Sequence, residues 1–94
     1  MIKKPSKEAS MALYQEIAKL NDVDACYRFF QDLCSVTELR AMEQRYDVAK
    51  LLYEGKIYTE IMETTGASSA TISRVNRVLQ YGANGLMDAF EQDT

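Results

Sequence analysis

The chain has 94 residues, room for one small domain with a modest core, and its 4 glycines and 1 proline favour helices. Its formal net charge is −3, from 11 basic and 14 acidic residues, which argues against indiscriminate nucleic-acid binding and still permits a local basic surface. No histidine occurs, which excludes a histidine-based metal site and histidine-based proton transfer.

The first third of the chain predicts two helices. Residues 1–5 are expected to be a disordered arm, and Ser6 can cap a helix that runs to about Leu20. A polar break at residues 21–22 separates it from a second helix over residues 23–34. Four residues of the second helix are expected to face inward: Cys26, Phe29, Phe30 and Leu33.

The two cysteines and the N-terminal residues indicate the cellular compartment in which the protein is expected. Cys26 and Cys34 are eight residues apart, a spacing that fits neither a metal site nor a CxxC motif, so we expect buried free thiols in a reducing compartment. The first ten residues lack the apolar segment of a signal peptide, and no stretch approaches the ~20 apolar residues of a membrane span. We therefore expect a soluble, cytoplasmic protein with no membrane partner.

The longest helix is predicted to begin at a capping box and to end at a glycine. Ser35 is followed three residues later by Glu38, and Gly55 follows the last helical residue, about Glu54. The helix carries a wide apolar stripe of eight residues: Leu39, Met42, Tyr46, Val48, Ala49, Leu51, Leu52 and Tyr53. This stripe is either the hub of a monomer core or in part a surface for a second subunit. We favour a homodimer, because a helical chain this short cannot easily bury so much apolar surface alone.

Residues 57–80 predict a helix-turn-helix, in which Gly66 closes a short first helix and Ser68 or Ser69 caps the second. On a 100° helical wheel three apolar residues of the second helix face inward: Ile72, Val75 and Leu79. The opposite face collects four residues: Ala70, Ser73, Arg74 and Arg77. Between Gly66 and Ala83 there is no acidic residue, so the local charge is +2.

Two functions fit this helix pair. Small side chains at a helix start can approach base edges and phosphates closely, and arginines can bind guanine or phosphate, which favours sequence-specific recognition of double-stranded DNA. The alternative is a helical protein-interaction module that uses the same arginine face on an acidic partner. Glu60 and Glu63 on the first helix count against DNA if they face the duplex. No paired carboxylates with a nucleophile, phosphate loop or metal constellation is visible in the sequence, so we expect neither an enzyme nor a metal site.

The end of the chain, residues 81–94, predicts a short closing helix capped by Asn84. Its apolar residues can pack on the N-terminal helices of a partner subunit: Leu86, Met87 and Phe90. The alternative is a frayed surface helix.

From about Ser35 to Leu79 the chain resembles the Trp repressor family, in particular its Trp-repressor-like group YerC/YecD. Residues 70–74 are close to that family's ATITR, and Glu60-Ile61 and Gly66-Ala67 match its first motif helix and turn. The resemblance implies an all-α fold of about six helices, an intertwined homodimer, and a single DNA-binding domain over residues 1–94 that acts as a repressor. It assigns DNA contacts to the start and outer face of the second motif helix: Ser69, Ala70, Thr71, Ser73, Arg74 and Arg77. Together with Ser68 at the start of the helix, these are the seven residues that we expect to bind DNA.

The resemblance also implies a co-repressor pocket, in which tryptophan lies between two arginines. Arg74 matches one of them, and the other is Arg45 or, in a register one residue away, Gln44. Ser35 can stand for the threonine that helps to hold the ligand's carboxylate.

Two departures from the family concern this pocket. Val75 replaces the family's glycine, and Val78 replaces a serine near the ligand's amino group. We therefore do not expect L-tryptophan to be the effector. Either the valines fill the cleft and the protein needs no ligand, or a different small molecule binds.

Overall fold

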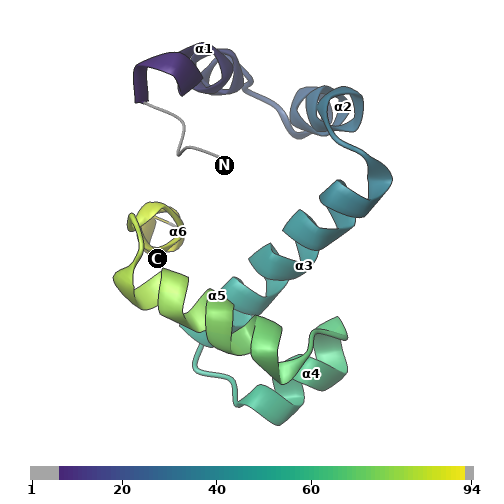
Figure 1. The fold of residues 1–94 in the computed structure, drawn as a ribbon, viewed down its shortest axis with the longest axis vertical. Helices are drawn as coiled ribbons and strands as arrows, with labels where there is room; N and C mark the ends of the chain where they lie inside the picture. The colour runs from purple at the N-terminus through teal and green to yellow at the C-terminus, as the bar shows by residue number, and fades with distance from the viewer. Residues whose placement is uncertain (1–6, 93–94) are drawn as a thin grey trace, which may run out of the picture. The chain divides into compact units, whose positions relative to one another are not determined.

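The computed structural model describes residues 7–92, with side chains from residue 11 onward. Over that range the chain forms six α-helices and no strand (Figure 1). The helices are α1 Lys7–Ala18, α2 Val23–Leu33, α3 Val36–Tyr53, α4 Tyr58–Thr65, α5 Ser69–Tyr81 and α6 Gly85–Gln92. The all-α prediction is confirmed, and each helix expected from the sequence is present. The predicted arm over residues 1–5 lies outside the described residues.

The chain divides into two compact units, Met1–Val36 and Thr37–Thr94. The expectation of one domain over residues 1–94 stays a prediction. None of the described helices is both long enough and apolar enough to cross a membrane.

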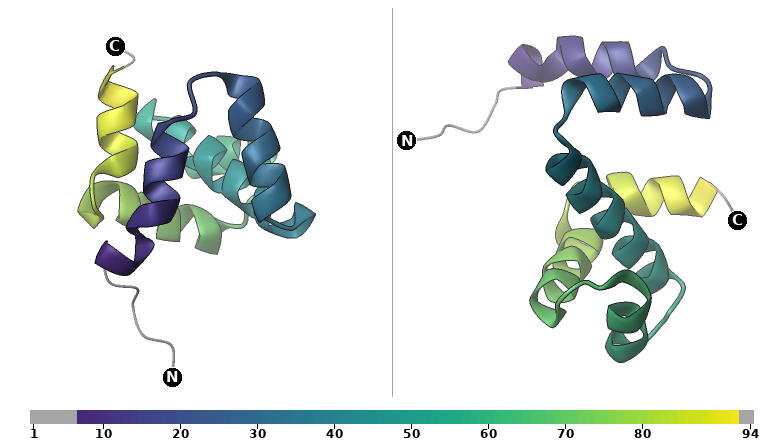
Figure 2. Two further views of the ribbon diagram at one scale, coloured as in Figure 1. Left: turned by 90° about the horizontal axis from the view of Figure 1, so that it is seen from above. Right: turned by 90° about the vertical axis from the view of Figure 1, so that its right-hand side faces the viewer.

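In the N-terminal unit α1 and α2 run antiparallel and are joined by residues 19–22 (Figure 2). Asp22 caps α2, because its carboxylate accepts a hydrogen bond of 2.8 Å from the backbone N–H of Ala25. No residue of α2 is buried in the single chain. Cys26 and Cys34 are free thiols, as predicted, but they are partly exposed. The expected inward position of Leu33 is wrong for the single chain, since its side chain is 53% exposed.

The core lies in the C-terminal unit, where α3, α4, α5 and α6 meet. Its buried residues are Val48, Ala49, Ile61, Ala67, Ile72, Val75, Leu79 and Phe90. The predicted inner face of the second motif helix is therefore confirmed in full. Because every helix of the unit contributes at least one of these residues, the apolar burial holds α4 and α5 against α3.

The closing helix α6 is held by Phe90, which is 1% exposed. Its ring packs against Tyr46 and Tyr53 of α3, with centroid separations of 5.8 and 5.3 Å. The ammonium of Lys50, also on α3, lies 4.8 Å from the centroid of the Phe90 ring. The sequence suggested that this residue packs on a partner subunit, whereas the structure packs it on α3 of its own chain.

Two glycines end helices in the left-handed conformation that favours this residue. Gly55 has φ 84°, and the N–H of Lys56 donates to the carbonyl of Leu51 at 3.0 Å, which is the pattern of a Schellman ending for α3. Gly66 has φ 73°, and its N–H donates to the carbonyl of Met62 at 2.9 Å. The second glycine reverses the chain between α4 and α5, as the sequence predicts.

The start of α5 is capped by Ser68, which decides between the two serines that the sequence offers. The Oγ of Ser68 accepts from the backbone N–H of Thr71 at 3.1 Å and donates to the hydroxyl of Thr71 at 3.1 Å. Ser69 is the first helical residue and is exposed.

Truncation of the core residue Ile72 tests the inner face. We expect Ile72→Ala to lower the free energy of unfolding by about 2–4 kcal/mol, because it removes apolar contacts and leaves a cavity. Urea denaturation measures the loss. Val78→Ala on the same helix is the control, because Val78 is 51% exposed. Equal losses in the two variants would contradict the assignment of the inner face.

A second prediction concerns the cap of α5. Ser68→Ala should lower the free energy of unfolding by about 1 kcal/mol, because the N–H of Thr71 loses its acceptor. Ser69→Ala, in which no capping bond is lost, should change it much less. If the two variants have the same thermal stability, Ser68 is not the effective cap.

Candidate nucleic-acid interface

We define the outer face of α5 by four residues: Ala70, Ser73, Arg74 and Arg77. All four are exposed, and they lie opposite the buried side chains of Ile72, Val75 and Leu79. The inner residues are held in the core, so α5 has little freedom to rotate about its own axis. The outer face is therefore presented to solvent in a fixed orientation.

The two arginines of the outer face have free guanidinium groups. Within the described part of the chain, neither Arg74 nor Arg77 forms a hydrogen bond or an ion pair. Two cations of the N-terminal unit differ in this respect: Arg28 bonds Asp24 at 2.8 Å, and Lys19 bonds Glu16 at 2.9 Å. The N–H donors of Arg74 and Arg77 remain available to a phosphate or a base edge.

The beginning of α5 adds small side chains to this surface. The first three positions are exposed: Ser68, Ser69 and Ala70. They lie at the positive end of the helix dipole, where the first backbone N–H groups have no partner within the helix. The hydroxyl of Ser68 is already engaged in the cap. Thr71 differs from the others, because it is partly buried on the flank of the helix. The structure thus brings together all seven residues assigned to DNA contact, six of them exposed.

Acidic side chains are also exposed on the first motif helix. Glu60 and Glu63 both have exposed side chains on α4, on either side of the buried Ile61. Their charges weaken any attraction that α4 itself exerts on phosphate. The exposed basic residues of the motif, Arg74 and Arg77, both lie on α5.

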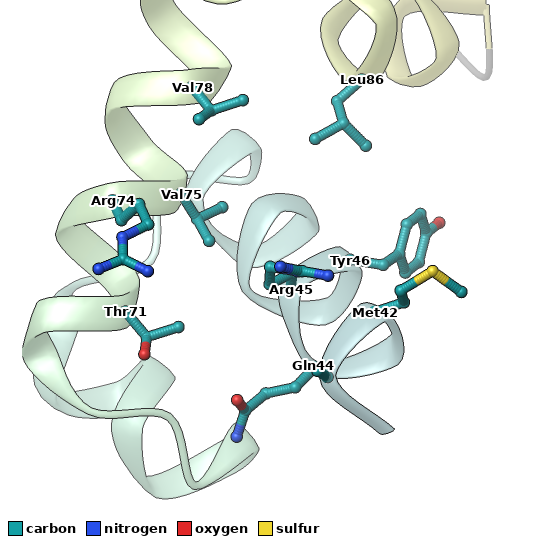
Figure 3. A pocket seen from close by; sticks show the side chains of 10 residues that line it. Met42, Gln44, Arg45, Tyr46, Thr71, Arg74, Val75, Val78 and Leu86 are labelled. Atoms are coloured by element: carbon teal, nitrogen blue, oxygen red, sulfur yellow. The ribbon is translucent and has the colours of Figure 1, made fainter. Parts of the chain in front are cut away.

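A pocket of about 520 Å³ lies beside α5, between α3 and α5, with Leu86 of α6 at one side (Figure 3). Its lining comprises Ala41, Met42, Gln44, Arg45, Tyr46, Thr71, Arg74, Val75, Val78 and Leu86. Val75 and Val78 are part of the wall, and an open volume remains beside them. No acidic residue lines this pocket, whereas two arginines do.

The residues assigned to an effector are only partly brought together. Arg45 of α3 and Arg74 of α5 line the same pocket. Gln44, the alternative to Arg45, also lines it, but the amide of Gln44 points toward the end of α4 and donates to the carbonyl of Thr65 at 3.2 Å (Figure 3). Ser35 belongs to the N-terminal unit and directly precedes α3.

Sequence reasoning did not identify four members of the pocket: Ala41, Met42, Tyr46 and Leu86. Helical spacing places Met42 and Tyr46 on the apolar stripe of α3, and Tyr46 is nevertheless 49% exposed. Spacing indicates which residues share a helix face. It gives no information on whether that face meets another side chain or an empty volume, because this depends on how the helices cross.

The sequence and the fold of this chain are similar to those of known proteins. The sequence model of the family described as Trp repressor protein matches residues 8–94. The uncharacterized protein YerC of Bacillus subtilis (strain 168) is 49% identical over 79 residues, which cover 84% of this chain and 72% of that protein.

Two solved structures have the same fold. A TrpR like protein from Eubacterium eligens ATCC 27750 superposes with a TM-score of 0.86 at 48% identity, over 90% of this chain and 88% of the other. A Staphylococcus aureus protein proposed to be a Trp repressor superposes with a TM-score of 0.85 at 40% identity, over 90% of this chain and 85% of the other. The resemblance read from residues 70–74 is confirmed, and the chain belongs to the Trp repressor family.

Proposed function

We propose that this protein is a sequence-specific DNA-binding regulator of transcription, and that it acts as a repressor by placing α5 in the major groove. The observation that carries the proposal is the outer face of α5, where Arg74 and Arg77 are unpaired among the described residues and follow a start of small side chains. Membership of the Trp repressor family supports it. In this role Arg74 and Arg77 bind phosphate or guanine, and the small residues permit close approach.

The proposal includes a homodimer. No residue of α2 is buried in the single chain, and large apolar residues of the N-terminal unit are exposed, among them Val23, Tyr27, Leu33 and Val36. A second copy can cover this surface, and a two-fold dimer presents two α5 helices to two half-sites. We place the protein in the cytoplasm, where it has access to DNA.

The pocket between Arg45 and Arg74 is where we place a small effector. Two unpaired guanidinium groups and an apolar wall suit an anionic molecule with an apolar body. The volume that remains beside Val75 and Val78 favours such a ligand over a cleft filled by its own side chains. The bulk of the two valines argues against L-tryptophan.

The double substitution of Arg74 and Arg77 by alanine tests the DNA interface. We expect specific DNA binding to be lost while the dimer and the fold stay intact, because both side chains are exposed and unpaired in the described structure. The probe is a duplex that the wild-type protein selects from random sequences, compared with a scrambled duplex at several salt concentrations.

A control variant with the same change of charge replaces Lys19 and Arg28, whose ion pairs are local and exposed. It should keep most of the specific affinity. Wild-type affinity in the Arg74/Arg77 variant would contradict the proposal. Binding that prefers no duplex, together with capture of an acidic protein surface, would favour the protein-interaction module.

Calorimetric titration with L-tryptophan tests the assignment of the pocket. We expect no binding in the micromolar range, because Val75 and Val78 occupy the positions where the family has a glycine and a serine. A micromolar dissociation constant that is lost in Arg45→Ala would show that the valines are compatible with tryptophan after all.

A further inference from the structure

Gln44 links the longest helix to the turn of the helix-turn-helix. The amide nitrogen of its side chain donates to the backbone carbonyl of Thr65 at 3.2 Å, across 21 positions of the sequence. Both residues are partly buried, so water competes with this bond less than it does on an open surface. Thr65 is the last residue of α4, and its carbonyl is one of the four that a helix end leaves without an intrahelical partner. Gln44 therefore satisfies an acceptor at the point where the chain leaves α4.

Thr65 is also the centre of the local bonds that shape the turn. Its hydroxyl donates to the carbonyl of Ile61 at 2.7 Å and accepts from the N–H of Ala67 at 3.1 Å. The N–H of Gly66 donates to the carbonyl of Met62 at 2.9 Å. The turn is thus tied to α4 by its own hydrogen bonds, and Gln44 adds a connection from Thr65 to α3.

Apolar contacts and this hydrogen bond constrain the motif differently. The burial of Ile61 and Ile72 holds α4 and α5 in the core and limits rotation of α5 about its own axis, but apolar attraction fixes the tilt of a helix less sharply than a directional bond does. A hydrogen bond weakens steeply when its angle departs from linearity, so it resists rotation as well as separation. Only three residues separate Thr65 from the start of α5, and a rotation at the turn therefore changes the direction in which α5 points.

We propose that Gln44 is a positioning residue for DNA recognition: its bond to Thr65 fixes the tilt at which α5 follows the turn, within the limits that the buried core sets, and so tunes the sequence preference of the protein. The proposal rests on the proposed function for its effect on DNA. Its effect on the turn can be measured without DNA. Gln44 acts through Thr65 and is assigned no contact with the duplex.

The experiment compares the wild-type protein with two variants. Gln44→Met keeps the length of the side chain and removes the donor, and Gln44→Glu places a carboxylate against the carbonyl of Thr65. Gln92→Met is the matched control, because Gln92 is exposed at the end of α6. Each protein is assayed for the ratio of its affinities for the selected and the scrambled duplex. Amide hydrogen exchange is measured at Gly66 and Ala67.

We expect Gln44→Met to lower the affinity ratio by roughly tenfold, on the scale of one hydrogen bond, with little change in binding to the scrambled duplex. Exchange at the two turn amides should rise in the order wild type, Gln44→Met, Gln44→Glu, while the amides of Ile72 and Val75 in the core keep their protection. A uniform loss of protection would mean general destabilisation and would overturn the positioning role.

The two readouts separate this inference from the proposed function. If the wild-type protein prefers no duplex, the proposed function fails, and exchange at Gly66 and Ala67 still decides whether Gln44 orders the turn. If the wild-type protein has a sequence preference and Gln44→Met retains both that preference and wild-type exchange, Gln44 has no positioning role.

Discussion

The packing of α5 on α3 is the constraint on which the rest of the C-terminal unit depends. Ile72 of α5 and both Val48 and Ala49 of α3 are completely buried. These side chains belong to one buried cluster, and close-packed interiors resist sliding and rotation. The orientation of α5 decides which residues face solvent. The exposure of Arg74 and Arg77 is therefore a consequence of what is buried on the other side of the same helix.

Arg74 belongs to two surfaces of the molecule. It lies on the outer face of α5 and also lines the pocket between α3 and α5. Arg45 faces the same pocket from α3, and the neighbouring Gln44 bonds the end of α4. Both residues line the pocket, and Gln44 also bonds the turn, because side chains one position apart on a helix point about 100° away from each other. The outer face of α5 and the pocket therefore share Arg74.

The N-terminal unit buries much less apolar surface within the single chain than the C-terminal unit does. The apolar residues of α2 follow helical spacing, but none is buried in the single chain, and Leu33 is largely exposed. Ordering α1 and α2 costs conformational entropy that this unit offsets only weakly by its own burial. This imbalance supports the proposal of a second copy, in which the same face acquires a partner.

Local rules acting on the sequence determined most of the architecture. Gly55 predicted the end of α3, and Gly66 predicted the end of α4. The serine pair at 68–69 predicted the start of α5, and the spacing of Ile72, Val75 and Leu79 predicted its buried face. Capping, positive φ and helical periodicity depend on neighbouring residues alone, so the sequence was sufficient for these features. Tertiary structure decided the rest. Phe90 packs on α3, Gln44 reaches the carbonyl of Thr65, and a pocket stays open beside Val75 and Val78. Each of these features depends on where helices far apart in the sequence cross, and helical periodicity carries no information about crossing geometry.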